Sequence, residues 1–359
     1  MKKIIKNYLY GLSKPNNPSY VTFYVNNICQ LRCDMCFYWD AMQKKTVQLS
    51  LDEIHKLSLS LKNLLQLSIT GGEPSLRKDL PEVVEIFCKN SNVAKCSIIT
   101  NGFLTDRIIK MAREILSKNK ETSFRFAVSL DGSKEVHNKI RGIDKSYDNA
   151  VITLNNLKEL KKEFNNLHVD INTCVSKYNY IDFLDFHNFV DKNFDPDHHT
   201  VTMTRGITKE SDANDIPIEF VEKIYRIIKN REKKFSDIEH KLIKSMRTIM
   251  YEEIERIFKE KKFKYYCTAG KKYLTIYQDG NVSACEILST IHPNQSSNMG
   301  NLKDYNFDCG KLLNNSVSNE RREWIKNNKC FCTFECAKSN DIVFNPSLAI
   351  KTIAKSIIS

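Results

Sequence analysis

An alternation of strand-like and helix-like segments constrains the fold more than any other feature of the chain. Six short runs rich in β-branched and apolar residues predict strands at Tyr20–Val25, Gln66–Thr70, Lys95–Thr100, Phe124–Leu130, His168–Val175 and Thr200–Thr204. Amphipathic segments between them predict helices at Leu51–Leu64, Thr105–Ser117 and Ser146–Phe164. Strands that alternate with helices form a parallel sheet with right-handed crossovers, so we expect an α/β fold.

Twelve cysteines in a chain of 359 residues need an explanation. No stretch of about 18 apolar residues could span a membrane, and the basic first seven residues lack the apolar run of a secretory signal. We therefore expect a cytoplasmic protein with no membrane partner, in which thiols stay reduced and clustered cysteines bind metals. Cys88, Cys96 and Cys174 are isolated among apolar neighbours and are expected to be small buried side chains, whereas Cys309 has no assigned role.

A tight group of three cysteines follows the first predicted strand. Cys29, Cys33 and Cys36 have the spacing C-x3-C-x2-C, which lets one loop ligate three corners of a [4Fe–4S] cluster and leaves the fourth iron open. Structural zinc is an alternative, but it needs a fourth ligand and no histidine lies close by in the sequence. Three unrelated thiols are the remaining possibility.

These cysteines resemble the hallmark of the radical S-adenosylmethionine (radical SAM) enzymes, and further family motifs follow in order. Gly71, Gly72 and Glu73 end the second predicted strand and resemble the GGE motif, which contacts the amine of S-adenosylmethionine. Glycines allow a close backbone approach, and a carboxylate accepts hydrogen bonds from an ammonium group. Asn101 ends the third strand in a segment that resembles the family's TNG motif near the ribose.

The fourth to sixth predicted strands end in residues that fit the same resemblance. Ser129 is followed by Asp131 and, twelve residues on, by Arg141. Related cysteine-rich members use a serine and an arginine at this spacing to bind the ribose and the carboxylate of S-adenosylmethionine. Asn172 and Arg205 are expected in the same cavity, because parallel α/β folds bind ligands at the carboxyl ends of their strands.

The resemblance implies a partial (β/α)6 TIM-like barrel over about residues 19–206. It also implies reductive cleavage of S-adenosylmethionine to methionine and a 5′-deoxyadenosyl radical, which removes a hydrogen atom from a C–H bond. The electron would come from an external donor such as flavodoxin or ferredoxin.

A second cysteine-rich region follows residue 264. Tyr273–Tyr277 and Val282–Ala284, joined by an Asp-Gly turn, predict a hairpin. Its surroundings resemble the SPASM/twitch extension of radical SAM enzymes, which holds auxiliary [4Fe–4S] clusters, and five cysteines match: Cys267, Cys285, Cys330, Cys332 and Cys336. We expect one auxiliary cluster held by Cys267, Cys285 and Cys336, completed by Cys332 or Cys330. Structural zinc bound by the same thiolates is the alternative.

The predicted organisation has five parts. They are an N-terminal segment (1–18), the radical SAM partial barrel (19–210), a basic helical connector (211–264), the SPASM/twitch-like domain (265–340) and a C-terminal tail (341–359) with a basic amphipathic helix. The chain has 55 Lys and Arg against 43 Asp and Glu, and residues 222–264 supply half of the excess. A solvated helix face is the expected use of this charge, and nucleic acid is an improbable partner because stacking aromatics are sparse there.

The expected reaction is the oxidation or epimerisation of a C–H centre in a small polar molecule such as a sugar or an alcohol. Glu286 follows a proposed cluster ligand and could act as a general base, although an exposed charge at the end of a hairpin is the simpler interpretation. Cys174, a tyrosine or a histidine could instead donate a hydrogen atom. The alternative function is a peptide maturase acting on a ribosomal precursor; the set of motifs argues against a cofactor-free binding module.

Overall fold

One mostly parallel sheet organises the part of the chain that a computed structural model describes, residues 2–230 and 238–358. Nine strands lie in the order β6-β5-β4-β3-β2-β1-β7-β8-β9. They are β1 (Tyr20–Tyr24), β2 (Gln66–Thr70), β3 (Lys95–Thr100), β4 (Ser123–Ser129), β5 (Leu167–Val175), β6 (His199–Met203), β7 (Tyr273–Ile276), β8 (Asn281–Ser283) and β9 (Asn298–Asn301). The six predicted barrel strands are thus confirmed, and they pair in parallel in the order of the sequence.

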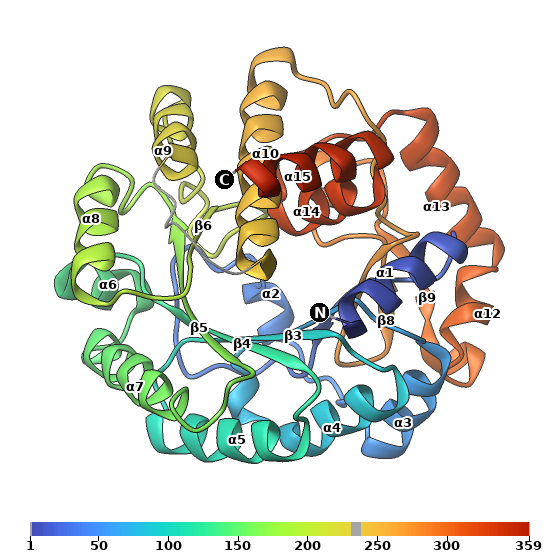
Figure 1. The fold of residues 1–359 in the computed structure, drawn as a ribbon, viewed down its shortest axis with the longest axis horizontal. Helices are drawn as coiled ribbons and strands as arrows, with labels where there is room; N and C mark the ends of the chain where they lie inside the picture. Colours follow the sequence, from blue (N-terminus) through green and yellow to red (C-terminus); the bar gives the residue numbers. More distant parts are fainter. Residues whose placement is uncertain (1, 231–237, 359) are drawn as a thin grey trace.

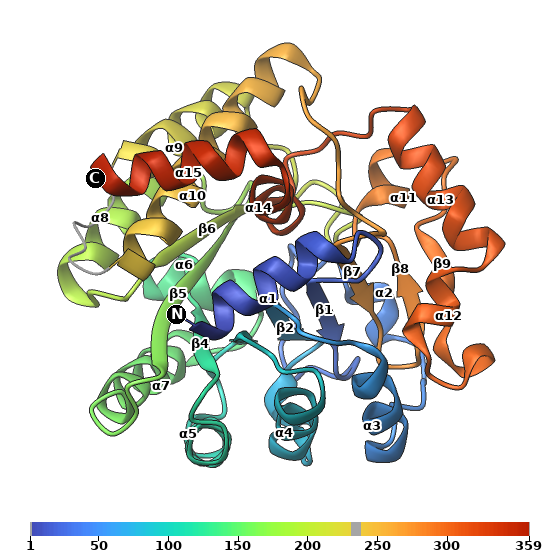
Figure 2. The same ribbon diagram turned by 45° about the vertical axis from the view of Figure 1, so that its right-hand side comes forward.

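Helices surround this curved sheet, and some of them line its convex side (Figure 1). They are α1 (Lys2–Ser13), α2 (Trp39–Met42), α3 (Leu51–Ser60), α4 (Leu80–Asn90), α5 (Thr105–Lys118), α6 (Lys134–Arg141), α7 (Ser146–Leu160), α8 (Phe183–Asn193), α9 (Ile218–Asn230), α10 (Ile238–Glu260), α11 (Leu288–Ile291), α12 (Cys309–Leu313), α13 (Ser316–Asn327), α14 (Glu335–Phe344) and α15 (Pro346–Ile358). The arrangement is the expected α/β partial barrel, and Figure 2 shows α3, α4, α5 and α7 side by side along its convex edge.

The alternation of side chains along β1 separates the core from the interior of the barrel. Val21 and Phe23 are fully buried, and the Phe23 ring contacts Phe87 of α4 with centroids 5.6 Å apart. Tyr20 and Tyr24 lie on the opposite face, because successive strand residues point to opposite sides. The side of β1 that faces the barrel interior therefore carries aromatic rings and hydroxyl groups.

The predicted hairpin is confirmed and continues the barrel sheet. β7 pairs with β8 in antiparallel register, Thr275 opposite Ser283. β7 also pairs in parallel with β1, Tyr20 opposite Tyr273 and Phe23 opposite Ile276. The cysteine-rich region therefore covers one edge of the barrel sheet, because β7 forms backbone hydrogen bonds with β1.

The basic connector forms α9 and α10, which gather with α14 and α15 beside β6 (Figure 1). Ile224, Ile249 and Ile254 are buried there together with Leu348 of α15. The part of the connector at residues 231–237 lies outside the described residues. The expected amphipathic helix of the tail is α15, and α14 runs across the boundary that we expected after residue 340. No helix in the described ranges is both long and apolar enough to cross a membrane.

Candidate functional site

The loop that carries Cys29, Cys33 and Cys36 is fixed to the end of β2 by backbone hydrogen bonds. Glu73 N donates to Ile28 O (2.8 Å), and the Asn26 side chain donates to Glu73 O (2.8 Å). The loop therefore has a defined position at the carboxyl ends of β1 and β2.

Gly71 and Gly72 are required by this close approach. Gly71 has a φ of +148°, and a Cβ there would lie 2.5 Å from Asn26 O. A Cβ on Gly72 would lie 2.1 Å from Ile28 O. Real side chains do not tolerate such distances, so the sequence must have glycine at both positions. The glycines are thus required by the close approach of the cysteine loop, whereas we expected them to allow the close approach of a ligand.

The Glu73 carboxylate connects the ends of β2 and β3. It is buried and accepts hydrogen bonds from Ser75 N (3.0 Å), Thr100 Oγ1 (2.8 Å) and Asn101 N (2.8 Å). Asn101 Nδ2 in turn lies 3.7 Å from Cys29 Sγ. Burial raises the pKa of Glu73, and these donors oppose that shift. In this structure the carboxylate therefore orients Asn101 toward the cysteine loop.

Asp131 and Arg141 form a buried ion pair on the other side of the cysteine loop. Arg141 Nε donates to Asp131 Oδ2 (2.6 Å), and Cys174 N donates to Asp131 Oδ1 (3.0 Å). Arg141 Nη1 lies 3.7 Å from Cys33 Sγ. Ser129 is buried and stands opposite Asn172 in the register of β4 and β5. Two of the residues predicted to contact S-adenosylmethionine, Asn101 and Arg141, therefore lie beside thiols of the loop, and Asp131 holds the Arg141 guanidinium in place.

The three thiols of the loop lie in an environment that disfavours thiolates without a cation. The pKa of Cys29 is raised to about 12 and that of Cys36 to about 11, mainly by burial, and neighbouring thiols contribute to both shifts. Burial also raises the pKa of Cys33, although Arg141 opposes the shift. Iron ligation needs deprotonated sulfur, so a bound metal centre would supply the compensating positive charge. The donor set fits a cluster with three cysteine ligands.

Four of the five later cysteines form one electrostatic neighbourhood. The charges of Cys330 and Cys332 raise the pKa of Cys267 and that of Cys285. Burial is the largest cause of each shift. Lys338 is buried beside them and pairs with Asp341 at 2.5 Å. The Lys338 cation lowers the pKa of Cys267, Cys330 and Cys332 and would stabilise the negative charge of a cluster bound there.

Cys336 has different surroundings, although we expected it to be one of the firmer ligands. Burial, followed by the Glu286 carboxylate, raises its pKa to about 12, and Tyr20 donates a hydrogen bond to its sulfur. Arg205 is also among its charged neighbours. The Cys336 side chain therefore belongs with the groups of the barrel interior.

Glu286 lies inside the barrel, at the end of the predicted hairpin. It is half-buried, which excludes the expectation of an exposed charge. Tyr24 Oη donates a hydrogen bond to Glu286 Oε1 (2.8 Å), and burial raises the pKa of the carboxyl. The Tyr24 ring contacts Tyr38 and Tyr277, with centroids 4.5 and 5.0 Å apart. A carboxylate with a raised pKa beside a phenol can move a proton at this wall of the barrel.

Arg205 follows β6 and forms an ion pair with Glu335 of α14. Burial opposes its charge, but Glu335 raises its pKa, and Tyr225 Oη also donates to Glu335 (2.9 Å). Arg205 Nη1 is buried and has no hydrogen-bond partner among the described residues. A donor of this kind can bind an anionic group of a ligand.

Sequence reasoning does not single out two participants in this region. Tyr24 is predicted only as part of a strand, and Glu335 carries no predicted role. Cys174, expected to be a small buried side chain or a hydrogen-atom donor, has its sulfur 3.3 Å from Thr204 Oγ1 and near Asp131. The alternation of β1 could have indicated Tyr24, whereas the position of Glu335 depends on how α14 packs. Cys88 and Cys96 are buried as expected, and Cys309 is buried as well.

The fold and the cysteine loop define a class of protein: a partial α/β barrel with three thiols at the carboxyl end of its first strand. Residues 23–190 match the family model described as the radical SAM superfamily. These residues are therefore a radical SAM domain, and the cofactors of that family are S-adenosylmethionine and a [4Fe–4S] cluster.

Curated relatives match in part of their length. GTP 3′,8-cyclase of Haemophilus ducreyi is 28% identical over 141 residues, which are 36% of this chain and 41% of that protein. Fe-coproporphyrin III synthase of Methanosarcina barkeri is 31% identical over 160 residues, 44% of this chain and 38% of that protein. The chain thus spans about two fifths of the length of these relatives.

Solved structures resemble the chain over most of its length. Streptococcus suis SuiB bound to S-adenosylmethionine aligns with 90% of this chain and 71% of its own, with a TM-score of 0.59 and 18% identity. The structure of anSMEcpe with bound AdoMet and Cp18Cys peptide aligns with 95% of this chain and 97% of its own, with a TM-score of 0.60 and 15% identity. At such low identity this likeness shows the fold.

Proposed function

We propose that the protein is a radical SAM enzyme that oxidises or epimerises a C–H centre of a small polar substrate such as a sugar or an alcohol. The observation that carries this proposal is the Tyr24–Glu286 pair, which lies inside the barrel with Cys336 near the carboxylate. A general base at this place can remove the proton of a substrate hydroxyl next to the carbon that loses a hydrogen atom.

The three loop cysteines and the later cysteines would hold two clusters. When bound, the first supplies the electron that cleaves S-adenosylmethionine to methionine and a 5′-deoxyadenosyl radical, and the second accepts an electron from the substrate. Cys267, Cys285, Cys330 and Cys332 influence one another's pKa, which supports these four cysteines as the ligands of the auxiliary cluster in a SPASM/twitch-like region. Cys336 is then left as a thiol of the cavity. A flavodoxin or a ferredoxin would supply the first electron.

The residues of the chain would bind and orient the substrate and the cofactor. Arg141 and Ser129 would contact S-adenosylmethionine beside the cysteine loop, as would Asn101 and the Gly71–Glu73 segment. Arg205, whose buried Nη1 has no hydrogen-bond partner in the described part of the chain, would bind an anionic group of the cofactor or the substrate.

Peptide maturation is the second candidate. SuiB has been solved bound to the precursor peptide SuiA, and anSMEcpe with the Cp18Cys peptide. Both folds cover most of this chain, which supports a barrel able to admit an extended peptide. The reaction at the C–H centre could be the same in both cases.

Cluster content and cofactor cleavage test the proposal. We expect the anaerobically reconstituted protein to hold about eight irons in two four-iron clusters, and to release 5′-deoxyadenosine with dithionite. Alanine at Cys29, Cys33 and Cys36 should abolish this release and leave about four irons. A wild-type content of only about four irons would contradict the auxiliary cluster, and bound zinc without cofactor cleavage would contradict the whole proposal.

A substrate screen separates the two candidates. Polyols and sugar derivatives are compared with short peptides, and the substrate class is the one that raises 5′-deoxyadenosine release above the substrate-free level. Deuterium uptake from D2O indicates epimerisation, and a product two hydrogens lighter indicates oxidation. If only peptides stimulate the release, the small-molecule proposal is wrong.

A further inference from the structure

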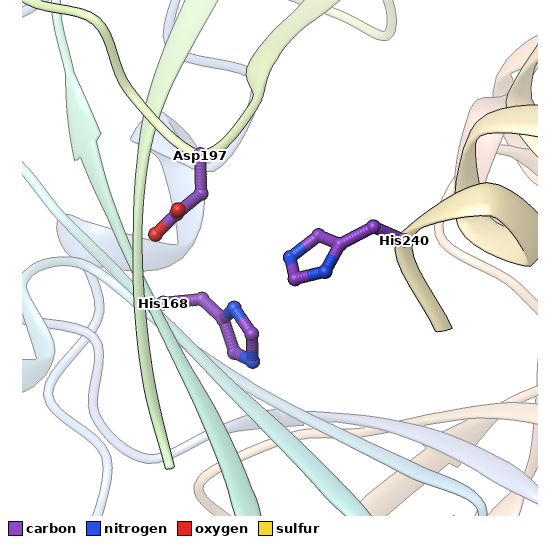
Figure 3. A group of neighbouring side chains, drawn as sticks. All are labelled: His168, Asp197 and His240. Carbon is purple, nitrogen blue, oxygen red and sulfur yellow. The ribbon is translucent and has the colours of Figure 1, made fainter. Parts of the chain in front are cut away.

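Three metal-binding side chains converge at the end of the sheet opposite to the cysteine loop. His168 lies at the start of β5, Asp197 directly before β6, and His240 in the first turn of α10. Their ligand atoms all lie within 4.8 Å of one another, and Figure 3 shows the three side chains pointing toward a common space. Because β1, β5 and β6 run in parallel, this group is remote from Cys29, which follows the far end of β1.

One member of the group has an unused buried ring nitrogen. His168 Nδ1 is shielded from solvent and has no hydrogen-bond partner within the described part of the chain. Buried polar atoms are nearly always partnered, so a missing partner needs an explanation. A metal ion bound to this nitrogen would provide one.

The Asp197 carboxylate is already oriented, as metal-ligating carboxylates usually are. Lys161 Nζ donates to Asp197 Oδ1 (2.5 Å), and Val169 N donates to Asp197 Oδ2 (2.8 Å). Each oxygen keeps a further lone pair, so these contacts fix the carboxylate without using all of its capacity.

The basic side chains around this group are paired with carboxylates, which reduces their repulsion of a bound cation. Arg125 forms an ion pair with the buried Asp170, and Arg247 lies 3.9 Å from the same carboxylate. Lys161 is paired with Asp197 itself. The nearby basic side chains are thus engaged with carboxylates of the same region.

A second group, His187, Asp191 and His199, is a weaker candidate. His187 Nδ1 and His199 Nδ1 share a hydrogen bond of 2.7 Å, and His199 Nε2 is 2.7 Å from Thr173 Oγ1. Both nitrogens of His199 therefore have partners, whereas His168 Nδ1 has none in residues 2–230 and 238–358.

We propose that His168, Asp197 and His240 bind one Zn²⁺ ion, which ties α10 to β5 and to the segment before β6. Two imidazoles and a carboxylate suit zinc, whereas calcium and magnesium prefer oxygen ligands throughout. A fourth position would be taken by water. The site lies away from the cysteine loop and is independent of the cluster chemistry.

Zinc retention by the iron-loaded protein tests the proposal. The reconstituted protein, with its cysteines occupied by iron, is washed with chelator, given one equivalent of Zn²⁺, desalted and analysed for metals. We expect about one zinc per chain, and His168→Gln or His240→Gln should lower its affinity by roughly tenfold or more. His187→Gln is the matched control and should retain zinc. Loss of zinc only in His187→Gln would overturn the assignment, and so would equal binding by all four proteins.

Zn K-edge X-ray absorption of the wild-type protein gives an answer that no folding defect can obscure. The proposed site predicts nitrogen and oxygen neighbours at about 2.0–2.1 Å, whereas zinc on cysteine would show sulfur at about 2.3 Å. A sulfur shell would overturn the proposal. Iron content and 5′-deoxyadenosine release, measured in each variant, should equal those of the wild type, which separates this inference from the proposed function.

Discussion

At the scale of single residues, the Tyr24–Glu286 hydrogen bond is the contact on which the chemistry depends. Glu286→Gln keeps the shape and the hydrogen-bond partner but cannot accept a proton. We expect product formation to fall by about 10²–10⁴-fold, because that is the usual contribution of a general base. Release of 5′-deoxyadenosine should persist, since the residues around Cys29 are unchanged. Liquid chromatography of both products measures the two rates.

The pH dependence of product formation is a second test of Glu286 as the general base. Burial raises the pKa of Glu286 above its ordinary value of 4.5, and the base is active only when deprotonated. Product formation should therefore rise with pH, with its acid limb above pH 4.5. Glu320→Gln, on the exposed side of α13, is the control and should leave the profile unchanged. An unaltered acid limb in Glu286→Gln would rule out Glu286 as the base.

At the scale of elements, the close approach of the cysteine loop to the end of β2 makes a prediction about Gly72. Gly72→Ala would place a methyl group 2.1 Å from Ile28 O and displace the loop. We expect the first cluster to be lost and about four irons to remain, measured by iron analysis and by electron paramagnetic resonance.

Gly310→Ala provides the matched control. Gly310 lies in α12 with a negative φ, and a Cβ there meets only Asp308 Oδ1 at 3.2 Å. The change should preserve the iron content and alter stability by at most about 1 kcal/mol. Equal iron content in both variants would show that the loop tolerates displacement.

The same scale shows how much could be predicted from the sequence. The strands, the hairpin and the thiol loop have local signals: hydrophobic period, an Asp-Gly turn and fixed cysteine spacing. The pairing of β7 with β1 joins residues about 250 positions apart, and no local pattern specifies it. Cys336 illustrates the limit within the site, because its spacing predicts a cluster ligand but does not indicate that Tyr20 and Glu286 lie beside its sulfur.

At the scale of the whole molecule, the continuous sheet predicts cooperative unfolding. β1 pairs with β2 and with β7, so the barrel and the cysteine-rich region share one set of ladder hydrogen bonds. Cys285→Ala, which removes a proposed auxiliary ligand, should lower the melting temperature of the entire chain and keep a single calorimetric transition. Ser289→Ala, at a nearby exposed position, is the control. Two separate transitions, with only one shifted by Cys285→Ala, would show independent units.

The position of β7 has a further consequence for what happens if the chain is shortened. Without the residues after 264, β1 would be an edge strand with a row of unpaired backbone groups beside Val21 and Phe23. Exposed edges of this kind recruit strands from other molecules and promote aggregation. The cysteine-rich region therefore protects the barrel against self-association, a role that it would have whether or not iron is bound.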